Sequence, residues 1–187
     1  RVVTCCRSCS RRVLLATRHE LLPYQSNSVI VEPEGTRSRN AAFFNLVDIV
    51  EHRLKEAAGK GPLVFDNNLL RVVVSVDATP VWQAAATRAD VWVAVPGATN
   101  PPQLSGAWST WFVLDGGDHA AALVALDEAA HLNGQIRHLQ DTWAATDSRG
   151  QVAQAVCYLT GDGKGMHSMS GPQRHLCWAC TANLRDL

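Results

Sequence analysis

The sequence lacks an excess of charge of either sign. Its 187 residues include 17 Lys and Arg against 17 Asp and Glu, so the formal net charge is zero. A protein that attracts nucleic acid, a membrane surface or an acidic partner through its overall field carries an unbalanced charge. Composition therefore gives no global electrostatic argument for any of these partners, and such a partner has to be argued from local residues.

Long apolar runs are also missing. Hydrophobic residues make up 47% of the chain, but no uninterrupted apolar segment reaches the roughly 18 residues that a membrane-spanning helix needs. We therefore expect no membrane partner. With 18% charged residues, the chain is too apolar for general disorder. Its length suits one ordinary domain, or one domain with an extension.

Cysteines are few, but four of the six stand in pairs. Cys6 and Cys9 have Cys-x-x-Cys spacing, as do Cys177 and Cys180, and Cys157 stands alone. This spacing favours metal binding in a reducing, intracellular compartment over a disulfide framework, which is normally denser and found in shorter secreted chains. Cys157 lies in an apolar stretch and is expected to pack as a small hydrophobe.

The pair Cys177 and Cys180 supplies half of a tetrahedral zinc site, whose ligands are Cys sulfur or His nitrogen. The other ligands stay open, with His167, His175 and the first cysteine pair as candidates. Free buried thiols and a redox pair are the alternatives. The redox reading is weaker because no strand of a thioredoxin-like unit leads into this motif.

The first sixty residues divide into a loop and a helix. Residues 20–40 contain Pro23, Pro33, Gly35 and many polar side chains, which is typical of a loop. Residues 1–39 are accordingly assigned to an N-terminal extension or linker. Apolar residues recur at helical spacing over 40–58, and Gly59 then follows. Residues 40–62 are expected to form a helix that precedes the core.

In the remaining chain, 63–187, some segments have the residue pattern of strands and one has that of a helix. Short β-branched or aromatic runs predict strands at 72–76, 91–96, 107–117 and 152–160, and a helical pattern covers 118–140. The run at 72–76 is typical of a strand that is buried on both faces. Three strands with short connections form a meander, and the helix allows a fourth strand to return parallel to the first. The predicted fold is α/β with a mixed sheet.

Two acids follow the first and fourth predicted strands, Asp77 in VVVSVDATP and Asp162 in LTGDG. Each alone is explained as a turn residue. If the two strands lie side by side, however, both carboxylates emerge at one edge of the sheet, where ligands of α/β proteins bind. Two such carboxylates repel each other unless a cation joins them, and they suit Mg²⁺ or Mn²⁺.

The order of these elements, together with VVVSVDATP and GDGKGMHSMSGPQRHLCWAC, resembles the DDE transposases of the RNase H-like integrase superfamily. The resemblance is to the Transib and V(D)J-recombinase type, and it covers roughly residues 70–182. It implies that Asp77 and Asp162 bind catalytic Mg²⁺ or Mn²⁺, and that Cys177 and Cys180 bind structural Zn²⁺. It further implies DNA as the partner, a nuclear location and chemistry that cleaves phosphodiesters and transfers strands, and it admits a homodimer.

The chain departs from that family after Cys180. A third acid on a later helix and the downstream histidines of the zinc site have no convincing counterpart in the last seven residues. We therefore expect a partial catalytic core, an RNase H-like sheet that is incomplete at the C-terminus and inactive on its own.

Two other functions stay open. One is a non-catalytic, zinc-stabilised binding module that is a domesticated or decayed relative. The other is an α/β enzyme that binds a nucleotide through residues 161–165. The glycines there lack the spacing of a phosphate-binding P-loop, so this is the weaker hypothesis.

Overall fold

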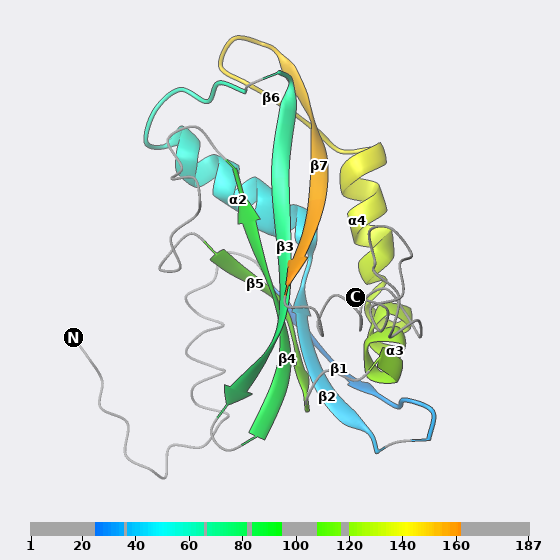
Figure 1. Cartoon of the computed structure of the whole chain (residues 1–187). Helices are drawn as coiled ribbons and strands as arrows, with labels where there is room; N and C mark the ends of the chain where they lie inside the picture. Colours follow the sequence, from blue (N-terminus) through cyan, green and yellow to red (C-terminus); the bar gives the residue numbers. More distant parts are fainter. Residues whose placement is uncertain are drawn as a thin grey trace, which may run out of the picture.

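The computed structural model describes residues 25–35, 37–65, 67–81, 84–94, 108–116 and 120–161, with main chain alone at 78–81, 84–85, 120 and 161. In these residues seven strands form one sheet beside three helices, which confirms the α/β class (Figure 1). The elements are β1 (Ser26–Val31), β2 (Arg39–Phe44), α2 (Leu46–Ala58), β3 (Leu69–Val81), β4 (Ala84–Val93), β5 (Trp108–Asp115), α3 (Ala120–Ala130), α4 (Leu132–Asp141), β6 (Ala144–Thr146) and β7 (Val152–Gly161).

The sheet has the strand order β1-β2-β5-β4-β3-β7-β6. Strands β3, β4 and β5 pair antiparallel in succession, and the chain then passes through α3 and α4 before β7 pairs parallel to β3. The predicted meander, helical connection and parallel return are therefore confirmed. Figure 1 shows β3 and β7 running side by side in the same direction.

The N-terminal part differs from the prediction. The expected loop at 20–40 contains β1, which forms an antiparallel hairpin with β2, and β2 extends the sheet by pairing with β5. Pro33 and Gly35 thus mark only the hairpin turn. The helix expected from residue 40 begins at Leu46, because Asn45 has extended backbone and its side chain accepts a hydrogen bond from the Val47 N–H, which caps the helix.

The single helix expected over 118–140 is two helices. The chain breaks at His131, whose φ of +52° is left-handed. Asp127, near the end of α3, accepts hydrogen bonds from the backbone N–H and the side chain of Asn133, at 2.7 and 2.6 Å. These bonds stabilise the start of α4. Strand β6 was not predicted, because three residues are too few for a periodic pattern.

One face of the sheet packs against the helices. Leu70, Val72, Val74 and Val76 of β3 are at most 1% exposed and share one hydrophobic core with residues of all three helices. The alternate positions of β3 are half-buried or exposed, and Leu69 is 43% exposed. The prediction that this strand is buried on both faces is therefore wrong, and we call the second face the open face.

A shift in the register between β4 and β5 adds an aromatic residue to the core. Between Ala89 and Asp90 of β4 the pairing with β5 moves from Phe112 to Thr110, which leaves Trp111 as the extra residue of a bulge. Trp111 and Phe112 are both fully buried, and their ring centroids lie 5.5 Å apart. The bulge lets two consecutive aromatic side chains pack into the core.

Candidate active site

Asp77 lies on β3, four residues before the strand ends. The strand was expected to stop at this acid, but its pairing with β4 continues to Val81 and Ala84. Asp77 alternates with the buried Val76 and is exposed on the open face. Within the described ranges it has no hydrogen bond or ion pair. Its carboxylate is therefore accessible to a ligand from solvent.

The register of β3 with β7 is the feature that bears on the second predicted acid. The parallel pairs run from Leu69 beside Gln154 to Val76 beside Gly161. Gly161 immediately precedes Asp162 in the sequence, as Val76 precedes Asp77. Asp162 itself lies outside the described residues, as do the cysteine pairs 6/9 and 177/180.

Polar side chains surround Asp77 on the open face. Arg88 of β4 lies directly opposite Asp77, and Asp90 lies opposite Ser75. Residues that pair directly across strands share a face of the sheet. Thr110 of β5 pairs with Asp90, and Thr160 of β7 pairs with Ser75. We call this set, Ser75, Asp77, Arg88, Asp90, Thr110 and Thr160, the open-face cluster.

Arg88 and Asp90 form the ion pair of this cluster. Arg88 Nε donates to Asp90 Oδ1 at 2.7 Å, with the two side chains 38% and 24% exposed. Sequence reasoning missed this pair because it predicted the second strand at 91–96, after both residues, whereas β4 spans Ala84–Val93. The signal was present in the spacing, since residues two apart in a strand point to the same face.

The donors at this edge fit a divalent metal only in part. The part of the chain that the structure describes holds no group of three or more His, Cys, Asp or Glu side chains suited to a metal ion. Magnesium, however, keeps several waters and uses one or two carboxylates. Asp77 fits as one such ligand because it is exposed and bonded to no other described group. Asp90 is less suited because Arg88 already occupies one of its oxygens.

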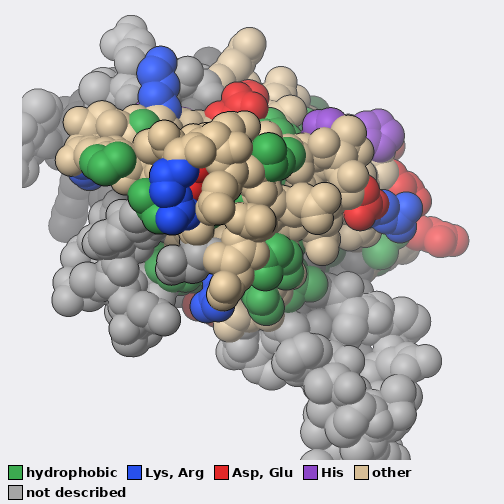
Figure 2. Space-filling view, turned by 90° about the horizontal axis from the view of Figure 1, so that it is seen from above, with side chains coloured by type: hydrophobic (Ala, Val, Ile, Leu, Met, Phe, Trp, Pro, Cys, Tyr) green, Lys and Arg blue, Asp and Glu red, His purple; other side chains and the backbone are tan. Residues whose placement is uncertain are grey.

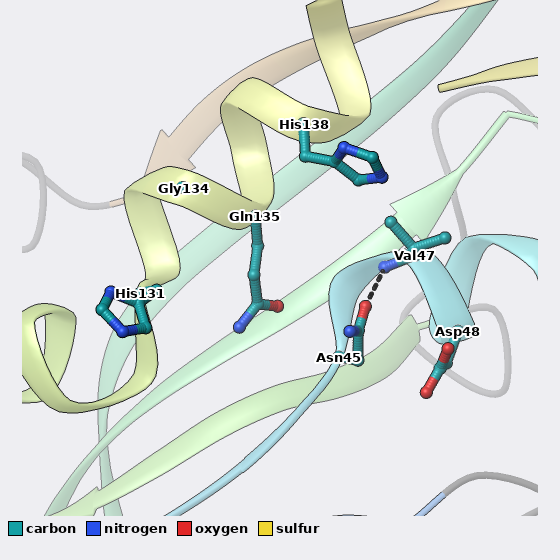
Figure 3. A pocket seen from close by; sticks show the side chains of 7 residues that line it. All are labelled: Asn45, Val47, Asp48, His131, Gly134, Gln135 and His138. Carbon is teal, nitrogen blue, oxygen red and sulfur yellow. Dashed lines mark hydrogen bonds between the residues drawn. The ribbon is translucent and has the colours of Figure 1, made fainter. Parts of the chain in front are cut away.

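A cavity of about 350 Å³ lies elsewhere, between the start of α2 and α4 (Figure 3). It is lined by Asn45, Val47, Asp48, His131, Gly134, Gln135 and His138. These residues come from the helices, so the cavity lies on the helical side of the sheet. It is separate from the open-face cluster.

The side chain of Gln135, which lines that cavity, has a structural role. Its Oε1 accepts hydrogen bonds from the Leu46 N–H at 2.8 Å and from Trp111 Nε1 at 3.2 Å. Its Nε2 donates to the carbonyl of Ala130 at 2.9 Å. One amide thus ties α4 to α2, to β5 and to the end of α3. Asp48, His131 and His138 are exposed at the rim, and they form no metal-binding group.

A second aspartate, Asp147, sits in the turn between β6 and β7 and has a structural role. Its side chain is fully buried. Its oxygens accept bonds from the N–H groups of Phe65, Arg149 and Gln151, and from the Arg149 side chain. Burial alone would raise the pKa of Asp147, but these hydrogen bonds outweigh it and hold the pKa below its ordinary value. Sequence analysis did not single out this residue.

Charged side chains do not gather by sign at that end of the molecule. Figure 2, seen from the end at which β3 begins, shows Lys and Arg, Asp and Glu, and His interspersed with apolar side chains. This agrees with the balanced composition. Among the described residues in this view, Lys and Arg form no separate basic patch.

Cys157 is on β7, beside Val72 of β3. It is partly buried against the hydrophobic core, which confirms the predicted packing role. Burial raises the pKa of its thiol to about 11. Such a thiol is a poor nucleophile near neutral pH.

No protein-family model, curated protein or solved structure matches this chain. Among the helices that the structure describes, none is both long enough and apolar enough to cross a membrane. Function therefore has to be argued from the open-face cluster and the strand register.

Proposed function

We propose that this chain is part of a transposase-like, RNase H-like catalytic core that cleaves and transfers DNA phosphodiesters with Mg²⁺ or Mn²⁺. One observation carries the proposal: β7 pairs parallel to β3, with Gly161 beside Val76, and Asp77 follows Val76 as an exposed carboxylate. The preceding meander and the helical crossover are the connectivity that such a core requires.

Chain connectivity supports a shared site for Asp77 and Asp162. Paired strands lie about 4.8 Å apart, and consecutive Cα atoms are about 3.8 Å apart. Gly161 pairs with Val76, and each of these two residues is followed directly in the sequence by one of the two acids. Two carboxylates brought together at this edge of the sheet would repel each other unless a cation or a proton joined them.

In the proposed reaction, Asp77 and Asp162 hold the divalent ion. When bound, the ion makes a water or a 3′-hydroxyl more acidic and neutralises charge on the phosphate oxygens. Asp77 suits this role because it is exposed and makes no competing ion pair in the described ranges. In the same proposal Cys177 and Cys180 contribute to a structural zinc site.

Metal binding by the full chain tests the proposal. We expect Asp77→Asn and Asp162→Asn each to weaken Mn²⁺ binding, measured by calorimetry, by at least about tenfold, because each removes a direct ligand. Asp141→Asn, which changes an exposed acid at the end of α4, is the matched control and should bind Mn²⁺ as the wild type does. Unchanged binding in both test variants would overturn the metal site, provided that their circular dichroism is native.

A further inference from the structure

We propose that Arg88 is the residue that binds the phosphodiester of the nucleic acid next to Asp77, and that Asp90 is a positioning residue for Arg88. This inference rests on the proposed function, because it assigns the group that holds the substrate at the same site. Arg88 was not among the residues that the sequence predicted for the site.

The position of Arg88 suits a phosphate bound beside Asp77. Arg88 pairs directly with Asp77 across β3 and β4, which places their Cβ atoms about 4.5–5.5 Å apart on one face of the sheet. The Arg88 side chain is 38% exposed, and Asp77 is exposed. A phosphate that contacts a metal held by Asp77 would therefore lie within reach of the Arg88 guanidinium.

Arg88 has more hydrogen-bond donors than the described residues use. A guanidinium carries five N–H donors, and within the described ranges Arg88 uses only Nε, toward Asp90 Oδ1. The four N–H donors on Nη1 and Nη2 meet no protein acceptor there. Nη1 and Nη2 together have the planar, forked geometry that binds two oxygens of a phosphate.

Asp90 orients the guanidinium of Arg88. Asp90 lies two residues from Arg88 on the same strand, and its 2.7 Å bond to Nε fixes the plane of the guanidinium. Because Asp90 takes Nε, the ion pair leaves both terminal nitrogens available. It also keeps Arg88 from neutralising Asp77, whose carboxylate makes no ion pair among the described side chains.

The hydroxyl groups of the cluster extend this surface along the sheet. Thr160, Ser75 and Thr110 occupy the neighbouring row on β7, β3 and β5. Thr160 is exposed, and the other two are half-buried. Hydroxyl groups commonly contact the phosphates of nucleic acids. The row therefore suits the phosphates next to the one that Arg88 holds.

The experiment measures DNA binding by the full chain without turnover. Fluorescence anisotropy with single-stranded and duplex DNA in Ca²⁺, over a range of salt, gives affinity and the salt dependence of affinity. We expect Arg88→Gln to weaken binding by about tenfold and to reduce the slope of log K against log salt by about one, the signature of one lost phosphate contact. Arg88→Lys keeps the charge but loses the fork, so it should recover only part of the affinity.

Arg71→Gln is the matched control. Arg71 is exposed on the same face of β3, six residues before Asp77 and thus about 20 Å away. It should bind DNA as the wild type does. Equal effects of Arg88→Gln and Arg71→Gln, or an unchanged salt slope in Arg88→Gln, would overturn the assignment.

The two proposals fail in different ways. If Asp77→Asn loses Mn²⁺ binding while Arg88→Gln binds DNA normally, the metal site stands and the role of Arg88 is wrong. If Arg88→Gln loses DNA binding while Asp77→Asn keeps Mn²⁺ binding, a nucleic-acid surface exists without the proposed metal chemistry. A wild-type chain that binds Mn²⁺ but no DNA overturns the role of Arg88 directly.

Discussion

The two ends of the β3–β7 pair each present an aspartate, and the two carboxylates have opposite surroundings. At the end where both strands begin, Asp147 is buried and accepts bonds from three backbone N–H groups and one arginine. At the other end, Asp77 is exposed, with no bond to any residue that the structure describes. The same side chain is thus fully satisfied by the protein at one end and accessible to a ligand at the other.

The arginines show the same contrast. Arg149 donates from Nε to Asp147 and from Nη2 to the carbonyl of Phe65 and to Gln151 Oε1, so it makes three hydrogen bonds within the protein. Arg88 donates once, to Asp90. A group whose hydrogen bonds are made inside the protein stabilises the fold, whereas a group with unused donors or acceptors at the surface can recognise a ligand.

The largest effect that this comparison predicts is on stability. Asp147→Ala removes a buried carboxylate and leaves the backbone N–H groups of Phe65, Arg149 and Gln151, together with Arg149 Nε, without this acceptor. We expect the melting temperature to fall by roughly 10 °C, because several hydrogen bonds of the turn are lost together. Thermal unfolding followed by circular dichroism measures it.

Asp77→Asn is the control at the opposite end, and it should shift the melting temperature by no more than about 2 °C, as exposed substitutions do. Equal losses in the two variants would mean that the two ends do not differ as argued. Asp147→Asn should fall between the two, since it keeps the shape and one acceptor oxygen but removes the charge.

Acidic pH should remove the contribution of Asp147 to the stability of the fold. Because the folded-state pKa of Asp147 lies below its ordinary value of 3.8, its contribution is fully present above that value and is lost as pH falls through 3.8 toward the folded pKa. Urea unfolding at a series of pH values from 7 to about 2 should therefore show a loss of stability that Asp147→Asn reduces in the lowest part of the range. An identical pH profile in both proteins would contradict the bonding described for this carboxylate.

Sequence periodicity predicted best the strands and helices whose conformation follows from their own local residues. The β-branched run at 72–76 and the apolar helix face of 118–140 are local signals, and they led to the parallel return of β7 beside β3. The hairpin of β1 and β2 was missed because its stability comes from pairing with β5, a partner about seventy residues away in the sequence. The break between α3 and α4 at His131 was missed because it depends on side-chain hydrogen bonds. Asp127 accepts two hydrogen bonds from Asn133, which apolar periodicity does not reveal.

The candidate site was predicted in part. Asp77 was expected, and the strand register places Gly161, next to Asp162, beside Val76. Arg88 and Asp90 were not expected, because which residues of β4 face Asp77 depends on the register between the two strands. A one-residue slip in that pairing would place Ala89 opposite Asp77 in the place of Arg88.

Glycine substitutions at the two ends of the sheet should change the free energy of unfolding by smaller amounts. Gly116, bridged to Ala86, and Gly150, in the Asp147 turn, both have positive φ, +92° and +79°. An added Cβ at Gly116 would collide with the guanidinium of Arg39, whereas at Gly150 it would meet nothing within 4 Å. We expect Gly150→Ala to cost about 1–2 kcal/mol from backbone strain alone, and Gly116→Ala to cost more only by the hydrogen bond from Arg39 Nη1 to the Asp115 carbonyl that is lost when the guanidinium moves.

Denaturant unfolding of the two variants provides the measurement. The difference between them isolates the collision, because the backbone strain is common to both. If Gly116→Ala is no less stable than Gly150→Ala, the Arg39 side chain moves aside at little cost, and its position against Gly116 is not a constraint on that edge of the sheet.

The smallest expected effect lies between the two ends, at Cys157. A thiol with a pKa of about 11, against an ordinary 9.0, has a thiolate fraction at pH 8 that is about a hundredfold lower, and the thiolate is the reactive form. Alkylation with iodoacetamide, followed by mass spectrometry of the peptide that contains Cys157, should therefore proceed about a hundredfold more slowly in the folded protein than in denaturant. Comparable rates in the two conditions would show that the middle of β7 opens readily, and β7 could not then hold the two ends of the sheet in the fixed register on which both proposals depend.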